Sequence, residues 1–182
     1  MPKRGPPKLG LTGMMSTEEY QNTLNGQIIS AGKNQASSAV LGVAAGEDRY
    51  LIPMTEVGEV IPVPKLAPVP LTQPWFLGLA NVRGDLYGIT DLGVYLGGHS
   101  TSFNLKSRIL LVSPGNKIYG GFMVYSMLGI RNLSEFTPAK SGKKKLPNGI
   151  NRQYEDTEGR LWRELSLLEL MKDEKFLQIA HG

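Results

Sequence analysis

The sequence predicts a mainly β protein of about nine or ten short strands with few helices. Turn-forming residues are frequent: 22 glycines and 12 prolines occur in 182 residues, almost a fifth of the chain against about 12% in an average protein. From residue 39 onward, short runs rich in β-branched and aromatic residues are separated by turn signals roughly every 8–12 residues. This spacing is typical of a sandwich or a barrel.

The first part of the chain differs in composition from the rest. Residues 1–15 hold three prolines and three glycines without periodicity, so a disordered tail is expected there. Ser16 or Thr17 then suits a helix N-cap, and an apolar stripe through Tyr20, Leu24 and Ile28 has helical spacing. We predict an N-terminal helix over residues 16–35 and a β domain over residues 36–182.

Within that domain the pattern predicts ten strands. Pro62 and Pro64 place the third of them at a sheet edge or a strand end, because proline cannot donate to a sheet. The polar stretch 98–107 is the best candidate for a link between two subdomains, and the loop 138–152 is expected to be flexible. The last segment, 166–180, has a helical apolar face. The expected strands are Val40–Val43, Arg49–Ile52, Val57–Val63, Leu77–Val82, Leu86–Thr90, Arg108–Ser113, Ile118–Val124, Ser126–Leu133, Gln153–Asp156 and Leu161–Leu165.

The composition excludes several classes of function. Without cysteine the chain has no disulfide, thiolate metal site or cysteine nucleophile. With only His99 and His181, a three-histidine metal site is excluded and a Ser-His-Asp triad is disfavoured. Nucleotide-binding glycine loops and the hydrolase elbow are also absent. We therefore expect no enzyme, cofactor or metal. No apolar run is long enough to span a bilayer, and a cytoplasmic protein is expected.

The net charge of +4 has an uneven origin. Eight bases lie in two short stretches, which leaves 12 bases against 16 acids in the rest of the chain. In the simplest interpretation, these bases lie in a solvated tail and a solvated loop. In the alternative, they contact an acidic partner or a membrane surface. An SH3-like barrel that binds nucleic acid through the basic loop stays open as a hypothesis. The eight bases are Lys3, Arg4, Lys8, Lys140, Lys143, Lys144, Lys145 and Arg152.

The run from Trp75 to Leu92 is the most informative part of the sequence. It predicts a hairpin in which Gly84 lets the chain turn with positive φ. Asp91 is placed to cap a short helix that follows the hairpin. Arg83 at the tip either packs its stem and hydrates its head, or offers a forked donor to a carboxylate.

This run resembles the signature of the CheW family, the adaptors of bacterial chemosensory arrays. The family pattern is a glycine, then Asn-x-Arg-Gly, a β run that ends in Asp-Leu, and Leu-Gly. Upstream, Val57-Gly58-Glu59-Val60 is similar to the family's Val-x-Glu-Ile, and the resemblance covers residues 39–182. The matching residues of the central run are Gly78, Asn81, Arg83, Gly84, Asp91, Leu92, Leu96 and Gly97.

The resemblance implies a CheW-like fold of two five-stranded SH3-like β-barrel subdomains, with short C-terminal helices. It also implies a non-catalytic role, in which the protein couples the cytoplasmic tip of a methyl-accepting chemoreceptor to the CheW-like regulatory domain of a CheA-type histidine kinase. Val57, Glu59 and Arg83 match family residues involved in that coupling. Glu59 and Arg83 either form a charge pair or contact the partner directly. Gly78, Asn81, Gly84 and Asp91 are expected to shape the hairpin.

One departure points to a branch of the family. Most CheW proteins carry proline where this chain has Gly88. Trp75, the pair Tyr87-Gly88 and the pair Leu161-Trp162 are instead similar to the PilI-type branch, the adaptors of type IV pilus systems. This likeness implies a role in twitching motility, in the cytoplasm at membrane-anchored receptor arrays. The alternative is an adaptor of flagellar chemotaxis.

Overall fold

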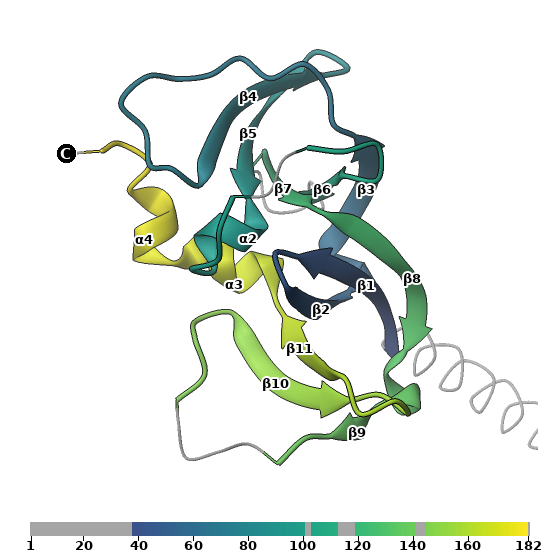
Figure 1. Cartoon of the computed structure of the whole chain (residues 1–182). Helices are drawn as coiled ribbons and strands as arrows, with labels where there is room; N and C mark the ends of the chain where they lie inside the picture. Colours follow the sequence, from purple (N-terminus) through teal and green to yellow (C-terminus); the bar gives the residue numbers. More distant parts are fainter. Residues whose placement is uncertain (1–37, 101–102, 113–118, 141–144, 182) are drawn as a thin grey trace, which may run out of the picture. The chain divides into compact units, whose positions relative to one another are not determined.

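Two β-sheets form the framework of the protein (Figure 1). The structure is a computed structural model that describes residues 38–100, 103–112, 119–140 and 145–181. The expected tail 1–15 and helix 16–35 therefore lie outside the described residues. Across the described ranges, no helix is both long and apolar enough to cross a membrane.

The first sheet has the strand order β8-β1-β2-β11-β10-β9. It contains two hairpins that the turn signals predicted, β1–β2 and β10–β11, and a parallel pairing of β11 with β2 joins them. We expected five strands, but the described sheet has six, because Thr137 and Pro138 form a two-residue strand beside β10. Its strands are β1 (Ala39–Ala45), β2 (Asp48–Pro53), β8 (Ser126–Asn132), β9 (Thr137–Pro138), β10 (Ile150–Glu155) and β11 (Leu161–Leu165).

The second sheet has the order β3-β6-β7-β5-β4. As the prolines predicted, β3 lies at an edge and ends at Pro62. The expected link between subdomains at 98–107 is wrong: this stretch connects two strands of the same sheet, and the chain changes sheet instead at η1 (Met54–Glu56) and at Tyr125. The strands are β3 (Val57–Pro62), β4 (Phe76–Val82), β5 (Asp85–Asp91), β6 (Arg108–Val112) and β7 (Gly120–Val124).

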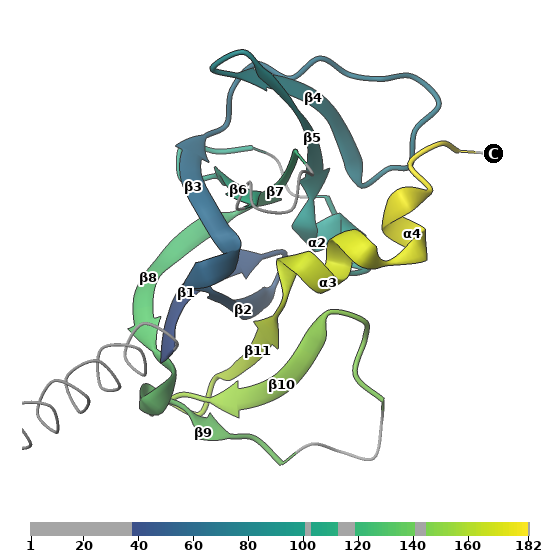
Figure 2. The same cartoon turned by 180° about the vertical axis from the view of Figure 1, so that it is seen from behind.

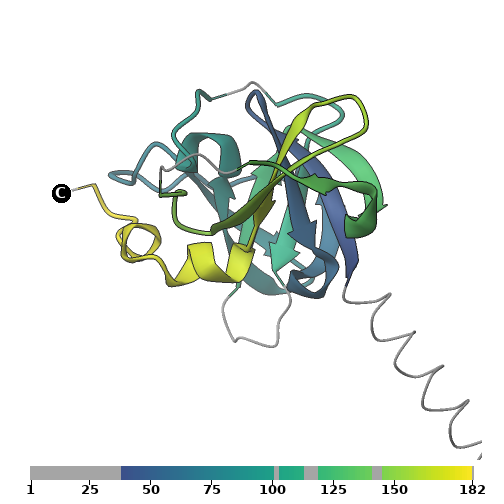
Figure 3. The same ribbon diagram turned by 90° about the horizontal axis from the view of Figure 1, so that it is seen from below.

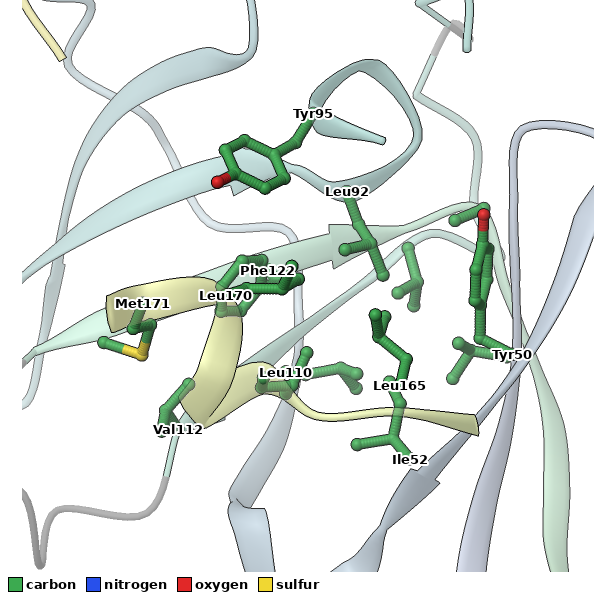
Figure 4. Packing of buried hydrophobic residues seen from close by; sticks show 14 of the residues in the cluster. Tyr50, Ile52, Leu92, Tyr95, Leu110, Val112, Phe122, Leu165, Leu170 and Met171 are labelled. Atoms are coloured by element: carbon green, nitrogen blue, oxygen red, sulfur yellow. The ribbon is translucent and has the colours of Figure 1, made fainter. Parts of the chain in front are cut away.

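The main hydrophobic core is shared by both sheets and by the helices. Figure 4 shows side chains from the two sheets converging with Leu92 of α2 (Leu92–Tyr95) and Leu170 of α3 (Leu167–Lys172). Phe122 lies in its middle with no exposed surface, and its ring is 5.6 Å from that of Phe176. Trp75 also stacks on Phe176, with ring centroids 5.8 Å apart. The same cluster contains Tyr50 and Ile52 of the first sheet, so burial of its side chains joins the two sheets into one unit.

The C-terminal segment is helical but not continuous. We expected helix over 166–180, whereas the structure has α3 and a separate one-turn helix, α4 (Glu174–Leu177), beside the strands (Figures 2 and 3). The break lies at Asp173, whose backbone is extended and whose carboxylate accepts the N–H of Lys175 as the cap of α4. Beyond α4, the N–H of Gln73 donates to the carbonyl of Ile179 at 2.8 Å.

A buried aspartate organises the β10–β11 turn. The carboxylate of Asp156 accepts hydrogen bonds from the indole of Trp162 at 2.9 Å and from Nε of Arg160 at 2.7 Å. It also accepts the backbone N–H groups of Glu158 and Arg160. Burial by itself raises the pKa of Asp156, but these hydrogen bonds outweigh burial and hold the pKa well below its usual range.

Acid is expected to remove the contribution of Asp156 to stability. The folded pKa lies below the unfolded value of about 3.9. The charged form therefore stabilises the fold above about pH 4, and this stabilisation is lost as pH falls further. Asp156→Asn should lower the urea midpoint at about pH 7, and the difference from wild type should shrink at about pH 3. An equal difference at both pH values would contradict this role.

Candidate functional site

The tip of the β4–β5 hairpin is a two-residue turn. Arg83 and Gly84 both have positive φ, at 55° and 95°, as a type I′ turn requires. The side-chain oxygen of Asn81 accepts the N–H of Gly84 at 3.0 Å, which holds the turn closed. A left-handed backbone is uncommon for arginine. The turn therefore presents the Arg83 side chain from a defined backbone position.

Arg83 and Glu59 form a forked ion pair. Nη1 lies 2.8 Å from Oε2 and Nη2 lies 2.6 Å from Oε1, and this hydrogen bonding raises the pKa of Arg83. The Arg83 side chain remains 75% exposed and that of Glu59 37% exposed. Exposed pairs contribute only about 0–1 kcal/mol to stability. Stability alone therefore does not account for this pair.

The ion pair also indicates that the second sheet is curled. Glu59 lies on β3, whereas Arg83 lies at the β4–β5 tip, and β3 and β4 are the two edges of the sheet. The sheet must therefore curl until its edges approach one another, as in a small barrel. The structure brings together two residues that lie 24 positions apart in the sequence.

A hollow of about 200 Å³ lies beside the ion pair. It is bordered by Glu59 and Arg83, together with Tyr87 and two residues of β6, Leu111 and Val112. The third matched residue, Val57, is half-buried opposite Val112 and packs against the main core. Val57 therefore contributes to the core, and its side chain is less exposed than that of Arg83.

The sequence interpretation missed a pair of tyrosines. The rings of Tyr87 and Tyr119 meet edge to face at 5.2 Å, and Tyr119 is 48% exposed. Burial and then the charge of Asp85 raise the pKa of the Tyr87 phenol, which stays protonated at neutral pH. Tyr87 could have been found from the sequence, because it is an aromatic residue inside the recognised motif. Tyr119 is brought there by the pairing of β5 with β7, which no local pattern reveals.

Gly78 and Asp91 lie away from the surface and support the hairpin. A Cβ on Gly78 would lie 2.3 Å from the carbonyl oxygen of Ala67, so only glycine permits this approach. Asp91 is 2% exposed and caps α2 by accepting the N–H of Val94 at 3.1 Å. Burial raises the pKa of Asp91, and backbone hydrogen bonds from Val94 and Gly93 oppose that shift.

The site has the chemistry of recognition. Its groups are an arginine, a carboxylate and two phenols around an apolar floor. Exposed arginine and tyrosine are the residue types that dominate binding energy at protein interfaces. In the described part of the chain, no group of three or more His, Asp or Glu side chains could hold a metal ion.

Comparisons with known proteins give a consistent picture. A family model described as "CheW-like domain" matches residues 39–175. The chain is 31% identical to the protein PilI of Pseudomonas aeruginosa over 107 residues, which make up 59% of this chain and 57% of PilI. It is 26% identical to the chemotaxis protein CheW of Helicobacter pylori over 132 residues, 68% of this chain and 80% of that protein.

The region matched to PilI spans less than two thirds of PilI's length. A further relative, the chemotaxis protein CheV3 of Helicobacter pylori, is 25% identical over a region that makes up 34% of its length. Among solved structures, the scaffolding protein TtCheW of Thermoanaerobacter tengcongensis superposes with a TM-score of 0.62. That match covers 76% of this chain and 94% of TtCheW at 17% identity, so it is a likeness of fold.

Proposed function

This chain belongs to the CheW-like domain family, and on that basis we propose that it is a non-catalytic adaptor of a chemosensory system. The expected mainly β, CheW-like fold with two sheets is confirmed. In the proposed role, the protein couples methyl-accepting chemoreceptors to a CheA-type histidine kinase. It acts through the docking of its surfaces.

One observation carries the proposal. The Glu59–Arg83 pair stands exposed where the two edges of the second sheet approach, beside a hollow with Leu111 and Val112 at its floor and the tyrosine pair. The guanidinium has five N–H donors, and the forked pair with Glu59 uses two of them. Donors therefore remain for a carboxylate or a carbonyl of a partner, while the ring faces of Tyr87 and Tyr119 supply apolar contact area.

We propose further that the system controls type IV pilus motility. The similarity to PilI supports this choice, and the runner-up is flagellar chemotaxis, supported by the longer but weaker match to CheW. Deleting the coding sequence in its own host separates the two. Loss of surface twitching with intact swimming supports the pilus role, and the reverse result supports the flagellar role.

Reversing the charge of Arg83 is expected to weaken capture of the kinase or the receptor at least tenfold, or about 1.4 kcal/mol. The reason is that the turn presents this guanidinium to the partner, and the variant replaces it with a repelling carboxylate. Binding of the Arg83→Glu chain to each purified partner measures the effect. Lys172→Glu, at an exposed position of α3, is the matched control and should bind like wild type.

A charge swap separates the two roles that the sequence left open. In Glu59→Arg/Arg83→Glu the ion pair can form again with its members exchanged. If the pair acts only within the domain, the double variant should recover wild-type capture. If Arg83 contacts the partner, capture stays weak although the fold is intact by circular dichroism. Capture unchanged in the single variant removes Arg83 from the site.

A further inference from the structure

A second exposed surface lies on the second sheet, away from the Glu59–Arg83 pair. Its centre is the segment 63–68, here called the strap, which runs from β3 towards β4 (Figure 1). Two hollows of about 570 and 490 Å³ share Pro64 and Leu66 of the strap. Phe103 and Leu105 border the first hollow and Leu86 borders the second.

The apolar side chains of this surface are unusually exposed. Leu105 is 97% exposed, Leu86 56% and Phe103 53%. Single exposed apolar residues are ordinary, but a group around connected hollows marks an interaction site. Leu86 and Tyr87 are neighbours in β5 and therefore point to opposite faces of the sheet. The hairpin thus carries the ion-pair hollow on one face and this surface on the other.

The surface is built on ordered backbone. Ala67 and Leu79 exchange two hydrogen bonds, of 2.8 and 2.9 Å, which tie the strap to β4. Leu105 stands at the tip of a closed turn, in which the N–H of Ser107 donates to the carbonyl of Asn104 at 3.0 Å. The guanidinium of Arg108 donates to the carbonyl of Leu105 at 2.9 Å. A leucine held outward on such a turn gains nothing from the fold and is pre-organised for contact with a partner.

The polar groups of the surface act as donors. Lys65 borders the second hollow, Lys106 follows Leu105, and none of the described residues that line the two hollows is an Asp or a Glu. The side-chain oxygen of Asn81 accepts the N–H of Gly84 and that of Asn104 accepts the N–H of Lys106. Among the described residues neither amide N–H₂ group donates a hydrogen bond, so both groups can donate to a partner. Cations and amide donors around an apolar centre are complementary to carboxylates.

We propose that this surface docks an apolar segment of a partner protein whose flanks carry acidic side chains. The inference rests on the proposed adaptor function and adds a second docking surface, separate from the ion-pair site. An adaptor needs two such surfaces to hold two partners at once, and the two faces of the β4–β5 hairpin supply them. Shaped hollows, of which one is bordered by Lys65 and the other lies beside Lys106, fit a protein segment better than an anionic membrane, which is bound by clusters of several basic residues.

The test measures binding of the full-length chain to the purified receptor cytoplasmic fragment and to the purified kinase. We expect Leu105→Glu to weaken binding of one of these partners at least tenfold and to leave the other within about twofold. Lys65→Glu should slow association with that same partner, most clearly at low salt. Leu177→Glu, which alters an exposed leucine of α4 that borders neither hollow, is the matched control and should bind both partners normally.

The outcomes separate this inference from the function on which it rests. If wild type binds both partners and Leu105→Glu binds them equally well, or loses both, the second surface is wrong while the adaptor role stands. Binding of wild type to phosphatidylglycerol vesicles that is lost in Leu105→Glu would also overturn it, in favour of a membrane. If wild type binds neither partner, the adaptor function fails and the inference fails with it.

Discussion

Replacing Phe122 with alanine is expected to lower the free energy of unfolding by about 3–5 kcal/mol. Phe122 has no exposed surface and packs between the sheets and Phe176, 5.6 Å from that ring. Its removal leaves a cavity that the surrounding strands cannot fill without moving both sheets. Urea unfolding followed by tryptophan fluorescence measures the change, since Trp75 belongs to the same aromatic cluster.

Leu177→Ala provides the comparison for Phe122→Ala. Leu177 is 68% exposed on α4, so this substitution should change the unfolding free energy by no more than about 0.5 kcal/mol. Native proteins typically have free energies of unfolding of about 5–15 kcal/mol. The Phe122→Ala variant therefore stays folded only if the free energy of unfolding of the wild type lies well above about 5 kcal/mol, the lower end of that range. A loss below about 1 kcal/mol for Phe122→Ala would contradict a core shared by the two sheets.

Gly78→Ala is expected to destabilise the protein by about 3 kcal/mol, through steric overlap and backbone strain together. The new Cβ would lie 2.3 Å from the carbonyl oxygen of Ala67, and the backbone φ of 124° disfavours any side chain. Relief requires the strap to leave β4, which breaks the two hydrogen bonds between Ala67 and Leu79. Thermal unfolding gives the loss, and amide exchange at Leu79 reports whether the strap has detached.

The matched control for Gly78→Ala is Gly84→Ala. Gly84 also has a positive φ, at 95°, but no atom lies within 4 Å of the position that its Cβ would take. Its substitution should therefore show the backbone strain alone, about 1 kcal/mol. Equal losses in the two variants would mean that the contact with Ala67 is not what requires glycine at position 78.

Much of the local structure could be predicted from the sequence. Alternation and turn residues placed the hairpins β1–β2, β4–β5 and β10–β11, since their signals lie within about a dozen neighbouring residues. Pro62 placed β3 at an edge for a similarly local reason, its missing N–H. The break between α3 and α4 was missed, because the apolar periodicity continues past Asp173 while its carboxylate starts a new helix.

Only part of the candidate site could be anticipated in this way. Recognition of the motif singled out Glu59 and Arg83 and left open whether they pair. Nothing in the motif indicated Tyr119, because its position depends on β7 lying parallel to β5. The exposed surface around the strap was equally hidden, since Leu105 looks like any apolar residue until its 97% exposure is known.

The sequence by itself determined the pieces that short-range physics controls: the Arg83-Gly84 turn, the Asp91 cap, and the lack of cysteine that excludes thiolate chemistry. The tertiary structure decided what those pieces face. Strands pair through backbone hydrogen bonds, and nearly every residue type can form these bonds. Local sequence patterns therefore do not indicate which strands, distant in the chain, will pair with one another. Curling of the second sheet brought Arg83 onto Glu59, while a closed turn before β6 left Leu105 facing outward.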